Sequence, residues 1–394
     1  MSERTQQIIW IILASIAAAL SVFTGFLFVK SFRAISTQAK LPYLIAYVSD
    51  HSGEFKIYLR DLEGHEIAAP MPFQPGDVLP VGEPLPPGSG REPRIAFIRF
   101  EAQPGSTSAS QIGTPGSVYI FTYGEDRATK VSGQVPRILA VVPAWSPDGK
   151  ELAFAGVEDL NGDGQFTKDE AGIYVCNVET GRVRRVATVY VISSHLRWSP
   201  IESALIFQAE KPNVPVPVAH LLDLTNGQLI TRDDATTAAC WSPDGQFIAF
   251  HSIADRKIHV LNKDGREQYA IDAPGQNVVE LQWVPARIAS SPEDKGYLVA
   301  MTTTSLGYSA GQLHIRSASP SSSERWESLT DAETSAAYLA VSPDGRYLAY
   351  TLLSGHGPTF NADLYVLELG QAQPRRLTTE PGFDGFPTWI PAEK

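Results

Sequence analysis

Four segments of this 394-residue chain repeat one short pattern, and this repetition constrains the fold more than any other feature. They read WSPDGKELAF from Trp145, WSPIESALIF from Trp198, WSPDGQFIAF from Trp241 and VSPDGRYLAY from Val341. A proline followed by Asp-Gly favours a tight turn, and the alternating residues after it favour a half-buried strand. Each copy therefore predicts two strands joined by a turn, although the copy from Trp198 is degraded and lacks Asp-Gly. In the other three copies the aspartate is expected to have a structural role rather than a catalytic one.

Seven short apolar cores of the second-strand type recur along the chain, at steps of 43 to 57 residues. They begin at Leu44, Ile95, Leu152, Leu205, Ile248, Leu298 and Leu348. Most are followed by a third strand such as GIYVCNV and a fourth such as RVRRVAT. Repeats of this length with several short strands are typical of β-propellers. The sequence predicts an all-β propeller of seven four-stranded blades; six blades remain an alternative because the second repeat is proline-rich.

The two ends of the repeat region complement each other. The first core, Leu44–Tyr47, has no Trp-type strand before it, whereas GFPTWIP at Gly385–Pro391 has no second strand after it. We expect the C-terminal strand to pair beside the first core and close the ring, which removes exposed sheet edges. Residues 41–394 are therefore predicted to form the propeller domain.

The SPDG turns followed by IAF or LAY resemble the WD40-like repeats of TolB and of the propellers that precede prolyl-oligopeptidase-type hydrolases. The resemblance covers residues 41–394 and implies a propeller fold. Propellers host unrelated activities, so it implies no particular function. The segment ahead of the repeats also differs from the α/β domain of TolB, and no role in the Tol system is carried over.

Residues 1–40 are expected to form a membrane anchor and linker. Ile8–Val29 contains no charged residue over 22 positions, enough for a helix of about 33 Å that spans a bilayer core of about 30 Å. Arg4 precedes this segment, whereas Lys30, Arg33 and Lys40 follow it, so a strict positive-inside count would leave the propeller in the cytoplasm. Because the resembled propellers are commonly extracytoplasmic, we expect a single-pass protein with its propeller in the periplasm or at the cell surface.

The segment DLNGDGQFTKDE, Asp159–Glu170, matches the twelve-residue calcium-loop pattern. Glycine stands at the sixth position, where that loop turns sharply. Ca²⁺ prefers six to eight oxygen ligands, and the spacing predicts a structural site inside a hairpin. The predicted ligands are Asp159, Asn161, Asp163, Gln165, Thr167 and Glu170.

Composition narrows the functional classes. The net charge of −11 and the sequence pI of about 5.3 argue against a nucleic-acid partner. Cys176 and Cys240 fall in different blades and are predicted to be buried and unbridged. GYSAG, Gly307–Gly311, matches the serine-hydrolase motif but lies between two propeller strands rather than in a strand-to-helix elbow, so we interpret it as a loop.

No catalytic constellation stands out, so the sequence favours a non-enzymatic binding or scaffold module for a protein, peptide or glycan. Long connections carry binding residues on many rigid scaffolds, and here they follow the second strands, with Phe166, Tyr308 and Phe360 as candidate aromatic contacts. These connections are Glu101–Gly116, Gly156–Gly172, Glu210–Pro217, Thr302–Gly311 and Leu353–Ala362. The alternative is a hydrolase or lyase with its site at the mouth of the central channel.

Overall fold

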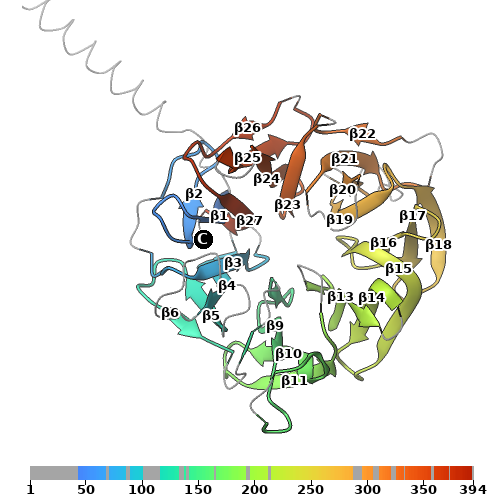
Figure 1. Cartoon of the computed structure of the whole chain (residues 1–394), viewed down its shortest axis with the longest axis horizontal. Coiled ribbons are helices and arrows are strands. Elements are labelled where there is room, and N and C mark those ends of the chain that lie inside the picture. Colours follow the sequence, from blue (N-terminus) through green and yellow to red (C-terminus); the bar gives the residue numbers. More distant parts are fainter. Residues whose placement is uncertain are drawn as a thin grey trace, which may run out of the picture. The chain divides into compact units, whose positions relative to one another are not determined.

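Seven antiparallel blades stand around a central opening in the part of the chain that follows Pro42 (Figure 1). The predicted propeller and its seven blades are confirmed, and the proline-rich second repeat forms a complete four-stranded blade. The computed structural model describes residues 43–67, 71–85, 89–100, 116–132, 137–138, 142–163, 166–191, 196–211, 214–286, 295–304, 310–320, 325–331, 333–355, 359–371 and 373–392.

Each blade runs outward from the central opening, from its first strand to its fourth. From blade 1 to blade 7, the innermost strands are β27 (Asp384–Pro391), β3 (Asp77–Gly82), β8 (Ala144–Trp145), β12 (Arg197–Trp198), β15 (Leu229–Trp241), β19 (Asn277–Val284) and β23 (Ser335–Val341). The second strands are β1 (Tyr43–Ser49), β4 (Arg94–Phe100), β9 (Glu151–Val157), β13 (Ala204–Lys211), β16 (Phe247–Ser252), β20 (Tyr297–Thr303) and β24 (Tyr347–Ser354). The third strands are β2 (Lys56–Arg60), β5 (Gly116–Thr122), β10 (Ala171–Asn177), β14 (Val214–Asp223), β17 (Lys257–Asn262), β21 (Gln312–Ser317) and β25 (Asn361–Glu368).

The fourth strands are shorter and less regular. They are β6 (Ala128–Lys130), β11 (Val183–Thr188), β18 (Glu267–Asp272), β22 (Glu327–Ser328) and β26 (Arg375–Arg376). In blade 4 the first part of β15 takes this place, and its second part continues as the innermost strand of blade 5. In blade 1 the described residues form one isolated β-bridge at this position, between Arg60 and Glu66. In blade 3, β7 (Arg137–Ile138) pairs with β9 beside β8.

The chain closes its ring through β27, as predicted from the two ends of the repeat region. This strand pairs antiparallel with β1, so that Trp389 lies opposite Ile45 and Ile390 opposite Leu44. Ile390 is fully buried. The Trp389 indole donates a hydrogen bond of 3.0 Å to the Ala340 carbonyl of blade 7. β27 therefore joins blade 1 to its neighbour as well as completing blade 1.

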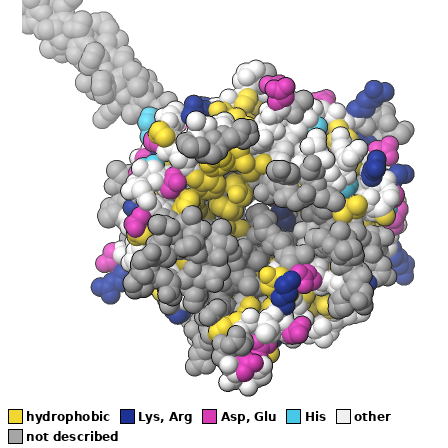
Figure 2. Space-filling view, viewed as in Figure 1, with side chains coloured by type: hydrophobic (Ala, Val, Ile, Leu, Met, Phe, Trp, Pro, Cys, Tyr) yellow, Lys and Arg dark blue, Asp and Glu magenta, His cyan; other side chains and the backbone are white. Residues whose placement is uncertain are grey.

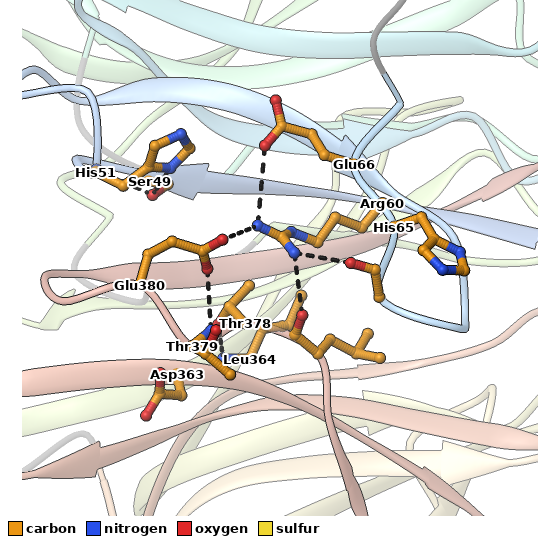
Figure 3. A network of polar contacts seen from close by, with 12 residues as sticks. Ser49, His51, Arg60, His65, Glu66, Asp363, Leu364, Thr378, Thr379 and Glu380 are labelled. Atoms are coloured by element: carbon orange, nitrogen blue, oxygen red, sulfur yellow. Dashed lines mark hydrogen bonds and ion pairs between the residues drawn. The ribbon is translucent and has the colours of Figure 1, made fainter.

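A buried arginine holds the same seam on its outer side (Figure 3). Arg60, 7% exposed, donates from Nε to the Tyr47 hydroxyl at 2.7 Å and from Nη1 to the carbonyls of Gly64 and Leu377 at 2.8 and 3.2 Å. Its Nη2 donates to Oε1 of Glu380 at 2.8 Å. One guanidinium thus satisfies four acceptors on blades 1 and 7.

The repeated Ser-Pro-Asp-Gly motif has the structural role predicted for it. In blade 5 the Ser242 hydroxyl donates to Asp244 Oδ1 at 2.6 Å, and the same carboxylate oxygen accepts the Gln246 N–H at 3.0 Å. Gly245 has φ of 65°, which suits glycine. The turns of blades 3 and 7 repeat these contacts. The tryptophan before a turn also links neighbouring blades, because Trp145 and Trp241 each donate a hydrogen bond to a carbonyl of the preceding blade.

A second repeat was missed in the sequence analysis. In six blades the second and third strands place two rings directly opposite each other, with centroids 5.2 to 6.1 Å apart. The pairs are Tyr47–Tyr58, Phe97–Tyr119, Phe154–Tyr174, Phe207–His220, Phe250–His259 and Tyr350–Tyr365. Such cross-strand pairs add to sheet stability. A Tyr or His within each third strand is the sequence signal for this ladder.

Both cysteines are buried and unbridged, as predicted. The expected membrane segment Ile8–Val29 lies outside the described residues. Within the described ranges, the structure has no helix that is long and apolar enough to cross a membrane.

Candidate functional site

Three neighbouring innermost strands, β3, β23 and β27, each contain a bulge in which two residues face one residue of the second strand. The first residue of each bulge has a left-handed backbone: φ is 53° at Leu79, 55° at Tyr338 and 54° at Phe386. Bulky side chains rarely adopt this region, and each instance costs about 1–3 kcal/mol. Bulges redirect side chains and are common beside functional sites. The strained backbone therefore draws attention to the inner rim of blades 7, 1 and 2.

Four rings gather at this rim, and we call them the channel-mouth patch: Phe55, Tyr338, Phe383 and Phe386. The Tyr338 and Phe386 rings lie 3.9 Å apart, and Phe383 lies 5.9 and 6.0 Å from them. Phe55 meets Phe383 edge-on at 5.8 Å. All four are only partly buried. Figure 2 shows hydrophobic side chains gathered beside the central opening, in the region of β23 and β27.

Strand direction places this patch on one face of the propeller. Phe55 ends the connection between β1 and β2, and Phe383 directly precedes β27. Antiparallel pairing puts these positions on the face opposite the Ser-Pro-Asp-Gly turns. We call the two sides the long-loop face and the turn face. The channel-mouth patch thus lies on the face predicted to bind a partner.

A cavity of about 320 Å³ continues from the Tyr338–Phe386 pair along the innermost strands of blades 1, 2, 6 and 7. Its lining is mostly apolar and rich in proline: Pro80, Val81, Gly82, Glu83, Pro84, Val142, Gln282, Tyr338, Leu339, Ala340, Val341, Pro343, Phe386, Pro387, Thr388 and Trp389. Pockets of this size with few polar groups suit apolar or aromatic side chains. Two rings of the patch, Tyr338 and Phe386, therefore also line this cavity.

The charged groups near this cavity are engaged in ion pairs. Glu83, 2% exposed, accepts two hydrogen bonds of 2.7 Å from Arg94 and lies 3.1 Å from Arg91. On blade 6, Glu280 Oε1 accepts hydrogen bonds from Arg197 at 3.3 Å and from Gln282 at 3.0 Å. These carboxylates order the inner strands.

Serine, histidine and aspartate meet at the ring closure, but not in the order of a hydrolase triad. The Ser49 hydroxyl lies 2.8 Å from His51 Nδ1 and is itself fully buried. Burial raises the pKa of the Asp384 carboxyl, and hydrogen bonds from Ser49 and Thr378 oppose that shift. Serine therefore stands between the other two groups, so the histidine does not bridge acid and nucleophile. Ser309 of the GYSAG motif lies outside the described residues.

The predicted calcium loop follows β9 and ends in η2 (Lys168–Glu170), a short 3₁₀ turn directly before β10. Asp159 Oδ1 accepts the N–H groups of Gly162 and Asp163 at 2.8 and 3.1 Å. Asn161 Oδ1 accepts the Asp163 N–H at 2.9 Å, so the first three predicted ligands share one tight turn. Gln165 lies outside the described residues.

Glu170 is buried at the other end of this loop. Its Oε1 accepts the Leu160 N–H at 2.9 Å, and its Oε2 accepts the N–H and hydroxyl of Thr167 at 3.1 and 3.2 Å. In the part of the chain that the structure describes, no three His, Cys, Asp or Glu side chains are grouped to share a metal ion. The calcium site stays a prediction.

The other predicted features of the long-loop face have mixed outcomes. Phe360 is 44% exposed and Phe166 is half-buried, whereas Tyr308 lies outside the described residues. The expected long loop Glu210–Pro217 is wrong, because β13 and β14 run through it and pair as far as Lys211 and Val214. Alternating valines and prolines hid these strands, since proline lowers the expectation of sheet pairing.

The channel-mouth patch itself was not identified from the sequence. A signal was present, because Leu79-Pro80 and Phe386-Pro387 place proline inside an otherwise strand-like run. Proline in that position often marks a bulge. In both strands the proline is the second residue of the bulge.

Comparison with known proteins supports the fold. No protein-family model matches the chain, and no curated protein matches its sequence. Similar solved structures include an oligogalacturonate lyase in complex with manganese, with 12% identity over 84% of this chain and 86% of that chain and a TM-score of 0.54. An oligogalacturonate lyase from Vibrio parahaemolyticus has 11% identity over 83% and 86% of the two chains and a TM-score of 0.53. TolB from Acinetobacter baumannii has 18% identity over 90% and 84%, with a TM-score of 0.49.

The protein is thus a seven-bladed β-propeller with an aromatic patch and an apolar cavity at its centre. The propeller class inferred from the sequence is confirmed by its seven blades. At these identities the likenesses concern the fold and no particular activity.

Proposed function

We propose that this chain is a membrane-tethered, extracytoplasmic propeller that binds a protein or peptide partner at the channel-mouth patch. The supporting observation is the patch itself: four partly exposed rings stand over an apolar cavity, and two of them are held by strained backbone. Exposed apolar patches on soluble domains commonly mark interaction sites. Aromatic residues in such a position are typical anchors of protein interfaces.

The apolar segment Ile8–Val29 supports the proposed membrane tether. The proposed binding site lies on the long-loop face. A glycan is the alternative occupant, because aromatic rings also stack on sugars. An isolated partner identified as protein or carbohydrate decides between them.

Crosslinking tests the binding site. A photoreactive residue at Glu54, which is exposed beside Phe55, should capture one partner in native membranes. Phe383→Ser should reduce that capture at least about fivefold, because truncating an interface anchor typically costs 1 kcal/mol or more. Ile230→Ser, at an exposed apolar position on the outer strand of blade 4 and outside the patch, is the control. Stronger capture from Lys150 or Gln246 on the turn face, or capture that survives Phe383→Ser, would contradict the proposal.

We also propose that the blade 3 loop binds Ca²⁺ as a structural ion. The Asp159 and Asn161 turn presents hard oxygen donors, the chemistry that calcium prefers. Saturation at one hundred times the dissociation constant should stabilise the fold by about 2.7 kcal/mol. Asp163→Ala should remove most of the rise in melting temperature with Ca²⁺ because it deletes an oxygen ligand, whereas Asp169→Ala, at an exposed non-ligand position of the same loop, should keep it. An equal rise in both variants would exclude this loop as the site.

A further inference from the structure

A second cavity lies on the turn face, between the outer parts of blades 6 and 7. Its volume is about 570 Å³. The ends of β21 and β25, the starts of β20 and β22, and Gly345 of the Ser-Pro-Asp-Gly turn surround it. It is therefore a groove along the seam between two blades, on the side opposite the channel-mouth patch.

The floor of this groove is the apolar core between the two blades. Leu367 and Leu369 are 3% and 8% exposed and pack in the same cluster as Ile315 and Leu329. Tyr297, at the rim, is 42% exposed. An occupant would thus find aliphatic side chains below it and an aromatic ring beside it.

The wall on blade 6 is the outermost strand, β22, together with the residues on either side of it. Trp326 points away from the groove, because its indole donates to the Asp272 carbonyl of blade 5 at 2.8 Å. Arg325, Glu327 and Leu329 line the groove, and Ser328 lines it between them. The wall presents a cation, an anion and an apolar group at steps of two residues.

Both charges on this wall are exposed, and neither forms an ion pair with another described residue. In the same region Arg346 pairs with Glu368 at 2.9 Å. Arg325 and Glu327 therefore stand at the groove as exposed charges.

We propose that this groove binds an extended peptide segment of a partner protein, which goes beyond the function proposed for the opposite face. The segment would carry an acidic side chain opposite Arg325, a basic one opposite Glu327 and an aliphatic one over Leu329. A β-strand matches this spacing because its alternate side chains share one face. Among the strands that the structure describes, β22 is the last of its sheet, so a peptide can also pair with this edge.

A charge exchange tests this assignment in the full chain. The probes are two seven-residue peptides with blocked ends. The first has glutamate, lysine and leucine at alternate positions, and the second exchanges the two charged residues; each is also made with its sequence reversed, because the strand direction is open. Fluorescence anisotropy measures their affinities. The wild type should bind the first peptide, in one of its two directions, about tenfold tighter than the second, since like charges across an interface are strongly unfavourable.

The double variant Arg325→Glu, Glu327→Arg keeps the net charge and should reverse this preference. Arg375→Glu, an exposed cation on β26 outside the groove, should leave it unchanged. Replacement of the peptide leucine by serine should weaken binding about tenfold through loss of the apolar contact. Equal affinity of the wild type for both peptides would overturn the proposal. Binding that depends on leucine but not on either charge would also overturn it, because the groove would then take a general apolar ligand.

Discussion

A chain that ends at Gly382 is expected to lose the cooperative unfolding transition of the propeller. Truncation removes β27, and with it the inner partner of β1 and the buried side chains of Trp389 and Ile390. Loss of a buried tryptophan alone typically costs about 3–5 kcal/mol, a large part of the 5–15 kcal/mol that stabilises a typical domain. Circular dichroism and differential scanning calorimetry measure this loss.

Two further chains separate closure from a general effect of truncation. A chain that ends at Ala392 keeps β27 and should melt like the whole protein. Trp389→Ala should be intermediate, because it removes the indole packed 5.8 Å from Tyr43 and the hydrogen bond to Ala340 but leaves the strand pairing. If the chain ending at Gly382 melted within a few degrees of the whole protein, β27 would not be needed to close the ring.

Most of the fold followed from local sequence patterns. The turn motif Ser242–Gly245 and the alternating strand after it fix their structure within a few residues. The ring closure also followed, because the unpaired strand at Gly385–Pro391 needed a partner and the first core lacked one. Repetition made these short patterns informative, since each blade supplied another instance of the same unit.

The candidate site was less predictable because it depends on contacts between distant segments. Tyr338 and Phe386 meet at 3.9 Å only after β23 and β27 become neighbours around the ring. Their left-handed backbone depends on the bulge register, which no local pattern specifies. The groove between blades 6 and 7 likewise brings Leu329 to Leu367 across a seam. Periodicity gives the faces of each strand but not how neighbouring blades pack.

Arg60→Met is expected to lower the free energy of unfolding by about 2–4 kcal/mol, because it leaves buried acceptors without their donor. Those acceptors are the Tyr47 hydroxyl, the carbonyls of Gly64 and Leu377, and the Glu380 carboxylate. Figure 3 shows the contact between Arg60 and Glu380. Urea unfolding measures the change. Arg346→Met is the matched control: its ion pair with Glu368 is solvent-exposed, and such pairs contribute about 0–1 kcal/mol. Equal losses in the two variants would mean that Arg60 does not hold the seam.

The pH dependence of Arg60→Met gives an independent test. Burial acts to raise the pKa of Glu380, but the Thr379 N–H and the Arg60 guanidinium outweigh it and lower the pKa from 4.5 to about 2. A carboxylate with a lowered folded-state pKa stabilises the fold above its unfolded pKa, and this contribution is lost as the pH falls toward the folded value. The stability difference between wild type and Arg60→Met should therefore be largest above pH 4.5 and shrink between pH 4.5 and 2. A difference that stays constant or grows across this range would show that Arg60 acts through its neutral acceptors and not through Glu380.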